Sequence, residues 1–293
     1  MVYGEMQKEH AILVSIVALI WGGSFIAVKI GVEDISPIIL AFFRFAIASP
    51  LMFFIMALRK KIVKISPADI PMLLVLSLTG VTLLYILQFT GIKYTSATNS
   101  ALLINTNVLF IAIFSWIFLK EEFSYRKIMG VLLSFIGVVF VISKGSFSIS
   151  PSIKGDILIL LSALCWAIYS IVGKKLLEKY DSLSLTTYTF IIGTFLFIPF
   201  IYHDVWSVKI STEGWAVILY LAILCSVFAY VAWYYALEKA EATEVAIFLN
   251  LIPLFAMLLA HLVLKERITI LTLIGASFII YGIYITLSGK KRA

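Results

Sequence analysis

The sequence predicts an all-α integral membrane protein with ten transmembrane helices in two inverted five-helix repeats. The first observation is composition: 62% of the 293 residues are hydrophobic and 13% are charged, with a mean hydropathy of +1.08, whereas soluble domains are about half apolar and a quarter charged. The second is a series of ten apolar segments, each long enough for a helix to cross about 30 Å of hydrocarbon. The third is a sequence repeat at one fixed offset.

The predicted spans follow one another with short connections, which leaves no room for a soluble domain. They cover residues 11–31, 36–58, 70–91, 97–119, 126–143, 156–176, 184–202, 214–236, 243–264 and 268–288. Helices are expected because a helix satisfies its own backbone hydrogen bonds in lipid and because long alternating strands are absent. The first segment carries Trp-Gly-Gly-Ser-Phe at its middle in place of a cleavage site, so we expect a retained helix and not a signal peptide.

The distribution of Lys and Arg predicts the orientation. If the spans alternate in direction, fifteen of these residues lie on the amino-terminal side of the membrane and seven on the other side. Basic residues accumulate on the cytoplasmic side, so both termini are expected in the cytoplasm, with the chain in the cell membrane. Topology and attraction to anionic lipids therefore account for the net charge of +7, and no nucleic-acid partner is expected.

The repeat relates positions that are 145 residues apart, without a gap. The matched pairs include Trp21 with Trp166, Phe45 with Phe190, Tyr85 with Tyr230, Ala97-Thr98 with Ala242-Thr243, Asn105 with Asn250, Lys120-Glu121 with Lys265-Glu266, Gly130 with Gly275 and Gly137 with Gly282. Chance matches in apolar sequence involve mainly Leu, Ile and Ala. Each copy holds five spans, and because five is odd the second copy is inverted. Inverted repeats are typical of transporters that alternate access to a central site.

The expected units are a first repeat over residues 1–143, a linker over 144–155 and a second repeat over 156–293 that ends in a short basic tail. The charged stretches LKEE and LKER each follow a long apolar run and mark where the fourth span of each repeat ends. Glu121 and Glu266 in these stretches are interpreted as solvated loop charges or as caps of the next helix, since carboxylates cost little near the interface.

Longer motifs resemble a known family. The stretches ALIWGGSFIAVKIG (18–31) and LAFFRFAIASPLMFF (40–54), with ATNSALLINTNVLF and ATEVAIFLNLIPLF at equivalent places in the two halves, are similar to EamA-type transporters of the drug/metabolite transporter superfamily. The resemblance covers nearly the whole chain. It implies ten helices in two inverted halves, a central cavity, and export or uptake of small metabolites. One departure is that the usual Pro of the fourth helix is present as Pro253 while its repeat mate is Val108, so a kink is expected in one half only.

Arg44 is the sharpest candidate for substrate contact. It lies about 12 Å along the second span, at 1.5 Å per residue, where an Arg costs ~2.5–3.5 kcal/mol to insert. Its repeat mate is Thr189, so the charge breaks the symmetry. Two interpretations are open: Arg44 binds an anionic group such as a substrate carboxylate, or it holds helix ends together through backbone carbonyls or extends toward the interface.

Further polar and aromatic residues are expected to form the central site with Arg44. They are Trp21, Ser24, Tyr85, Gln88, Asn99, Asn105, Trp166, Tyr169, Tyr230, Trp233 and Asn250. Aromatic walls with few polar groups suit an amphipathic organic solute, although such groups also simply join helices. Gly22-Gly23 permits either close helix packing or a local break. Asn107 adds another amide, and His261 is interpreted as an interfacial or packing residue in preference to a proton relay.

These patterns favour a secondary transporter that moves a small organic metabolite, an amino acid or a similar anionic solute, by alternating access, with export favoured. A lipid flippase is the main alternative. An integral membrane enzyme is less well supported, since no H-E-x-x-H or G-x-S-x-G motif occurs.

Buried thiols, lipid contacts and the location of the acids complete the expectations. Cys165 and Cys225 lie in apolar spans and are expected as buried thiols. The sixteen Asp and Glu lie in loops or at helix ends, so no deep carboxylate site for a coupling ion is predicted. No cofactor or metal is expected, and the expected partners are the small-molecule substrate and membrane lipids, with the chain a monomer or homodimer.

Overall fold

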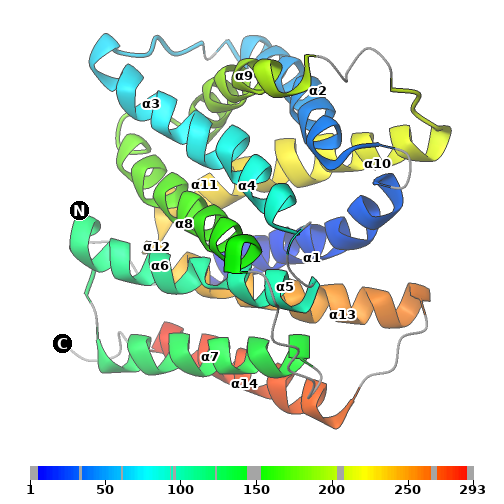
Figure 1. Ribbon diagram of the computed structural model, residues 1–293. Coiled ribbons are helices and arrows are strands. Elements are labelled where there is room, and N and C mark those ends of the chain that lie inside the picture. The colour runs from blue at the N-terminus through cyan, green and yellow to red at the C-terminus, as the bar shows by residue number, and fades with distance from the viewer. Residues whose placement is uncertain are drawn as a thin grey trace.

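The protein is a bundle of long helices (Figure 1). The computed structural model describes residues 6–32, 35–60, 62–92, 94, 97–122, 124–143, 153–202, 208–264 and 269–288. Within these residues there is no strand, and ten helical segments are long and apolar enough to cross a membrane. The predicted all-α fold with ten transmembrane helices is confirmed.

The boundaries follow the sequence pattern closely. The first half contains α1 (Lys8–Gly31), α2 (Pro37–Leu58), η1 (Pro67–Asp69), α3 (Ile70–Ser77), η2 (Leu78–Thr82), α4 (Leu83–Ile92), α5 (Ala97–Asn105), α6 (Asn107–Phe114), η3 (Ser115–Leu119) and α7 (Tyr125–Ser143). The second half contains α8 (Ile153–Leu176), α9 (Ser182–Ile201), α10 (Thr212–Ala222), η4 (Ile223–Phe228), α11 (Ala229–Lys239), α12 (Ala242–Ala246), η5 (Ile247–Asn250), α13 (Leu251–Leu264) and α14 (Ile270–Leu287). Every span ends within about three residues of its predicted limit, because hydropathy sets these limits.

The ten transmembrane helices are called spans 1 to 10 in chain order. Consecutive spans alternate in direction, which gives the bundle two ends. We call the end where α1 begins and α14 ends the near end, and the opposite end the far end. At the near end Glu121, just after span 4, bonds to the backbone of Ala242 at the start of span 9. At the far end the ammonium group of Lys154, at the start of span 6, lies 4.6 Å from the ring centre of Tyr94, just after span 3.

Four spans are irregular, in two equivalent pairs. Spans 3 and 8 contain the π-helical segments η2 and η4, which begin 145 residues apart. Span 4 breaks at Thr106, and span 9 contains the 3₁₀ segment η5. The expectation of a kink in one half only was therefore wrong. In span 4 the side chains of Asn105 and Thr106 bond to the carbonyls of Ala101 and Leu103, and such local bonds compete with a regular helix.

Several residues touch their own repeat mates, as an inverted repeat around a two-fold axis requires. The Tyr85 and Tyr230 hydroxyls are 3.2 Å apart, and the Ser49 and Thr194 hydroxyls are 2.9 Å apart. The Phe45 and Phe190 ring centres are 4.9 Å apart. The Trp21 and Trp166 ring centres are 5.3 Å apart. A residue reaches its own mate only near the axis, so these four pairs trace that axis through the molecule.

Glycines bring helices close together at two places. In α7 and α14, which lie side by side at the bottom of Figure 1, a Cβ on Gly137 would be 2.6 Å from the Gly275 carbonyl oxygen and one on Gly130 would be 2.6 Å from that of Gly282. In α1, which is continuous, Gly22 packs against the backbone of α13 near Ala256. The glycine pair in the first span therefore serves close packing and does not break the helix.

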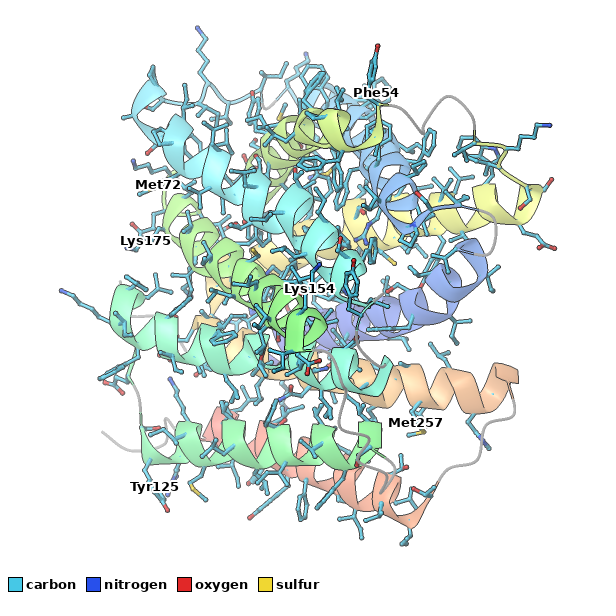
Figure 2. All side chains as sticks on the ribbon, viewed as in Figure 1. Phe54, Met72, Tyr125, Lys154, Lys175 and Met257 are labelled. Carbon is cyan, nitrogen blue, oxygen red and sulfur yellow. The ribbon has the colours of Figure 1, made fainter. Side chains whose placement is uncertain are left out.

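The outer surface of the bundle is apolar and the interior contains the polar groups. Phe54 and Tyr125 are 58% and 75% exposed and project from the bundle in Figure 2. In the described part of the chain, many other large hydrophobic side chains are exposed in the same way. Water would disfavour so large an apolar surface, whereas lipid does not.

Candidate functional site

A cavity of about 200 Å³ lies between the two repeats at mid-depth and extends toward the far end. Spans 1 to 4 of the first repeat and spans 6, 8 and 9 of the second contribute to its wall. Of the residues expected from the sequence, the wall contains Trp21, Ser24, Arg44, Tyr85, Gln88, Asn105, Trp166 and Tyr230. Toward the far end it continues with Val28, Phe89 and Ile92, the last residue of α4. The wall is mostly apolar with a few polar groups, as solute-binding cavities are.

Among the described side chains of this wall, Arg44 is the only cation. Only 6% of the residue is exposed, and its guanidinium donates hydrogen bonds to the Ser226 hydroxyl and, at 3.0 Å, to the Cys225 carbonyl oxygen. The guanidinium carbon is 5.1 Å from the centre of the Tyr85 ring and 5.8 Å from that of Tyr230. A guanidinium has five N–H groups, so these contacts orient the group and leave donors over.

The partners of Arg44 come from the irregular part of span 8. Cys225 and Ser226 lie in the π-helical segment η4. The Cys225 carbonyl accepts hydrogen bonds from the side chains of both Arg44 and Trp21, each at 3.0 Å. Its repeat mate, the Gly80 carbonyl in η2, accepts a hydrogen bond of 3.2 Å from the Tyr230 hydroxyl. Carbonyls in π-helical segments are thus used twice to orient side chains at the centre, which agrees with the frequent location of such segments at functional sites.

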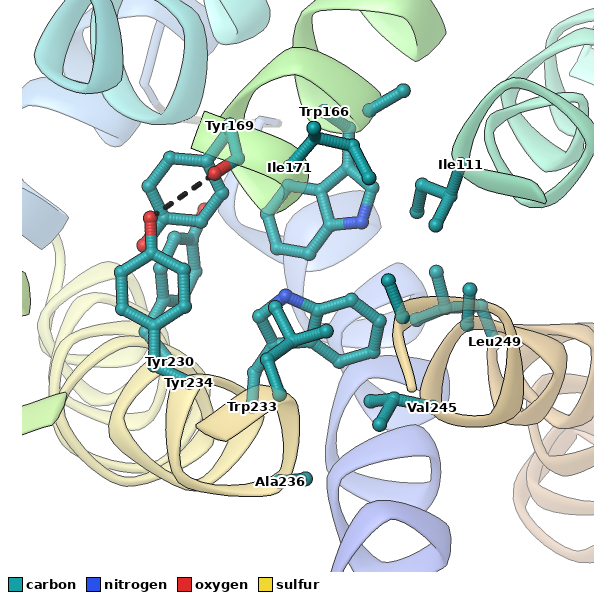
Figure 3. Close-up of a cluster of buried hydrophobic side chains, with 14 of the residues drawn as sticks. Ile111, Trp166, Tyr169, Ile171, Tyr230, Trp233, Tyr234, Ala236, Val245 and Leu249 are labelled. Carbon is teal, nitrogen blue, oxygen red and sulfur yellow. Dashed lines mark hydrogen bonds between the residues drawn. The ribbon is translucent and has the colours of Figure 1, made fainter. Parts of the chain in front are cut away.

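Aromatic rings form the closed inner end of the cavity, which we call the floor. The Trp166 ring is 5.5 Å from Tyr230 and 5.6 Å from Trp233. Tyr169 stacks on Tyr234 at 4.8 Å beside them (Figure 3). Beyond the rings, toward the near end, the space is filled by buried apolar side chains, which include Ile111, Ile171, Ala236 and Val245. In this conformation the floor separates the cavity from the near end.

Two polar atoms on the cavity wall have no hydrogen-bond partner within the described part of the chain. They are the indole nitrogen of Trp166 and the amide oxygen Oδ1 of Asn107. Buried polar groups are nearly always paired, because an unpaired one costs about 1–3 kcal/mol. An indole N–H can only donate and an amide oxygen can only accept. Two residues of the wall therefore hold one buried donor and one buried acceptor that no described residue satisfies, near the charge of Arg44.

Four expected site residues do not line the cavity or cannot be assigned to it. Tyr169 and Trp233 are fully buried and belong to the floor. Asn250 is also fully buried, and its amide donates to the Ser134 hydroxyl at 2.7 Å, which joins span 9 to span 5. The side chain of Asn99 lies outside the described residues. His261 is exposed near the end of α13, away from the cavity wall.

Buried charges gather at the near end, where the sequence suggested solvated ones. Glu121 is only 7% exposed, and its carboxylate accepts hydrogen bonds from the backbone N–H groups of Ala242 and Thr243 at 2.6 and 3.3 Å. The interpretation of Glu121 as a solvated charge was therefore wrong, and it caps span 9 instead of the helix that follows it. Lys120, with a left-handed φ of 55°, ends span 4 just before Glu121. Lys265 and Glu266, the repeat mates, lie outside the described residues.

Both cysteines are free and buried, as expected. Within the described part of the chain, no group of His, Cys, Asp and Glu has the arrangement of a metal site. Outside the spans, the hydrogen bond from Lys179 to Asp69 raises the pKa of that lysine. The cysteine thiols and the Lys179–Asp69 pair take no part in the wall of the central cavity.

Comparisons with known proteins agree with this architecture. The model of the EamA-like transporter family matches residues 9–143 and again residues 153–288. An uncharacterized transporter of Archaeoglobus fulgidus is 44% identical over 291 residues, which cover 98% of this chain and 100% of that protein. The uncharacterized transporter YyaM of Bacillus subtilis is 31% identical over 278 residues, covering 92% of this chain and 90% of that one.

The fold is also found among solved structures. A crystal structure of a protein with 17% sequence identity has a TM-score of 0.86 and covers 97% of this chain and 99% of its own. At this identity the match supports the fold alone. The ten apolar helices and the family model make the chain a multi-pass membrane protein, and family and relatives alike indicate a transporter in preference to an enzyme. The chain belongs to the EamA-like transporter family.

Proposed function

We propose that the protein is a secondary transporter of the cell membrane that moves a small amphipathic organic anion, such as a carboxylate-bearing metabolite, through the central cavity by alternating access. Both termini lie in the cytoplasm in this proposal, and export is the favoured direction. The observation that carries the proposal is Arg44, a buried cation on the cavity wall at mid-depth.

The environment of Arg44 supports an anionic solute. No carboxylate forms an ion pair with it among the described residues, and the acceptors that it bonds there, which include the Ser226 hydroxyl and the Cys225 carbonyl, are neutral. A buried charge without a counter-charge is costly. A carboxylate that enters the cavity supplies the missing charge and accepts the remaining N–H groups, and bonds of this kind are about twice as strong as neutral ones.

The rest of the wall supports an apolar body on that solute. Trp21, Phe25, Tyr85, Phe89 and Tyr230 surround the space next to Arg44. The Trp166 indole nitrogen and the Asn107 amide oxygen, which are buried and have no partner among the described residues, add one donor and one acceptor to residues of the wall. A cavity of about 200 Å³ suits a molecule with one carboxylate, one ring or short chain, and one or two further polar groups.

A matched pair of probes tests the charge requirement. We would measure the melting temperature of the purified protein in detergent with hydrocinnamate and with hydrocinnamamide, its neutral isostere. A ligand of the folded state raises the melting temperature by mass action. Hydrocinnamate is expected to stabilise the wild type and to lose about ten- to a hundredfold in affinity in the Arg44→Gln variant, the effect of one charged hydrogen-bonding partner.

The same measurement contains the outcomes that would reject the proposal. Equal stabilisation by acid and amide, or an unchanged response in Arg44→Gln, would make Arg44 a structural residue. Stabilisation by phospholipids alone, with no response to either soluble probe, would identify a lipid flippase instead. Thr189→Ala is the control, because Thr189 is the repeat mate of Arg44 and, among the described residues, bonds only to the Leu185 carbonyl in its own helix.

A further inference from the structure

We propose that four buried charged residues at the near end form the gate that keeps this side closed while the cavity extends to the far end. The residues are Glu121, Lys127, Lys174 and Glu241, which we call the near-end clasp. The inference rests on the proposed alternating access, because a gate has meaning only if the near side also opens.

The clasp is a continuous network of ion pairs and hydrogen bonds. Lys127 of α7 pairs with Glu241, in the turn between α11 and α12. Lys174 near the end of α8 lies 3.4 Å from Glu121 and also donates to the Ala240 carbonyl. The Glu121 carboxylate caps Ala242 and Thr243 at the start of span 9. All four side chains are at most 7% exposed.

Nearly every bond in the clasp joins one repeat to the other. Glu121 and Lys127 belong to the first repeat, whereas Lys174, Glu241 and the capped backbone belong to the second. The Ser115 hydroxyl adds a fifth tie across the same boundary, 2.8 Å from that of Thr243. Movement of one repeat against the other at the near end must therefore break these bonds together.

The clasp lies directly under the floor of the cavity. Glu241 follows α11, which carries Trp233 and Tyr234, and precedes α12, which carries Val245. At a rise of about 1.5 Å per residue, the four residues from Glu241 to Val245 span roughly 6 Å. Separation of the turn at Glu241 from α7 and α8 would thus open the apolar plug between cavity and near end.

The energetics suit a reversible gate. Removing one partner of a buried pair is strongly unfavourable because it leaves a buried charge alone, while separation into water restores the hydration of both charges. A clasp at the membrane surface can follow the second route, since water enters as the repeats part. Apolar side chains that separate gain no comparable hydration, so apolar packing alone would oppose opening. The clasp therefore stabilises the closed state and still permits an open one.

Reciprocal cysteine labelling tests the clasp without any ligand. In a Cys165→Ala/Cys225→Ala background, Ala236→Cys reports on the near side and Val28→Cys on the far side of the cavity. For each reporter, an impermeant maleimide is added to oriented membranes from the side that the reporter faces, which is the near side for position 236 and the far side for position 28. In Glu121→Gln, labelling at position 236 should become about tenfold faster or more, and labelling at position 28 should become slower, because the population moves to the near-open state.

Glu122→Gln is the matched control, because Glu122 is exposed and lies next to Glu121; both rates should stay at the wild-type values. Faster labelling at position 236 with no change at position 28 would mean local loosening only and would overturn the proposal of a gate. No change at either position would overturn it as well. If Glu121→Gln does not fold, charge exchange replaces it: Lys127→Glu alone should open the near side, and Lys127→Glu/Glu241→Lys should close it again.

This experiment and the ligand experiment fail separately. Loss of the reciprocal labelling change, with a wild-type response to hydrocinnamate, rejects the clasp and leaves the central anion site in place. A reciprocal change in labelling without any response to hydrocinnamate leaves the gate and rejects the substrate class.

Discussion

In the proposed function, Arg44 makes one binding site out of a nearly symmetric scaffold. Its repeat mate Thr189 is fully buried and donates a hydrogen bond to the Leu185 carbonyl within its own helix. The neighbours that orient Arg44, Tyr85 and Tyr230, are mates of each other and lie on the two-fold axis. In that proposal, a cation beside the axis would hold an anion in the same central place from either side, as a site exposed in turn to both ends requires.

Ser226, in the π-helical segment η4, orients the guanidinium of Arg44. Ser226→Ala removes the acceptor of the Arg44 Nε–H group. Loss of one hydrogen bond to a charged group is worth about 1.5–3 kcal/mol, so we expect hydrocinnamate to bind about tenfold more weakly, measured as the midpoint of a thermal-shift titration. Ser226→Thr retains the hydroxyl and should restore affinity.

Ser170→Ala provides the comparison for that variant, since Ser170 is equally buried but, in the described part of the chain, bonds only to the Trp166 carbonyl of its own helix. Unchanged affinity in Ser226→Ala, or an equal loss in Ser170→Ala, would show that the orientation of Arg44 does not depend on this contact.

At the residue scale, the sequence could identify polar groups in apolar spans but not their partners. Arg44, Trp21 and Tyr85 stand out in the sequence because a charged side chain, or an aromatic one with a polar group, is unusual in the middle of a span. All three line the cavity. Asn250 shares the repeat pattern of Asn105 but faces Ser134, because equivalent positions lie on opposite sides of an asymmetric cavity. Glu121 was misinterpreted because its partner is 121 residues away in the chain.

At the element scale, hydropathy predicts where each helix begins and ends but not how it is wound inside. The spans match because length and apolarity are fixed by the bilayer. The π-helical segments η2 and η4 carry no proline, so nothing in their composition marks them. Because η2 and η4 lie at equivalent positions of the two repeats, a π-helical segment in one repeat predicts one in the other.

An element-scale prediction concerns the crossing of α7 and α14. Gly137→Leu would force these helices apart, because even a Cβ at this position comes within 2.6 Å of the Gly275 carbonyl oxygen. Overpacking of this kind costs about 1–3 kcal/mol, so the melting temperature should fall. Ser277→Leu adds a larger side chain on the exposed face of α14 and should change the melting temperature little. Equal effects of the two would argue against close packing at this crossing.

At the scale of the whole molecule, the prediction from charge is that the near end faces the cytoplasm. Glu178 lies in the exposed near-end turn after α8, and Thr212 is exposed at the far-end start of α10. In a background without native cysteines, an impermeant maleimide applied to intact cells should label Thr212→Cys at once and Glu178→Cys only after permeabilisation. The opposite order would invert the orientation and the proposed direction of transport.

The two-fold axis gives a rule for which contacts survive the transport cycle. If the near-open state arises when the two repeats exchange conformations, a contact between positions i and j becomes one between their repeat mates. A contact between a residue and its own mate then maps onto itself. The pair Ser49 and Thr194 is of this kind, whereas the pair Ser115 and Thr243 at the clasp is not.

Two engineered disulfides test this rule in one experiment. In both pairs the side-chain oxygens are within 2.9 Å of each other, so the sulfur atoms of two cysteines at these positions would start close together. Oxidised Ser115→Cys/Thr243→Cys should hold the near end shut and reduce efflux of labelled hydrocinnamate from proteoliposomes to below about a tenth of the reduced rate, because the open state is removed. Oxidised Ser49→Cys/Thr194→Cys also joins the repeats, yet it should retain most of the efflux. Loss of transport in both variants would mean that the repeats separate along the axis itself, and retention in both would mean that the near end does not open at Thr243.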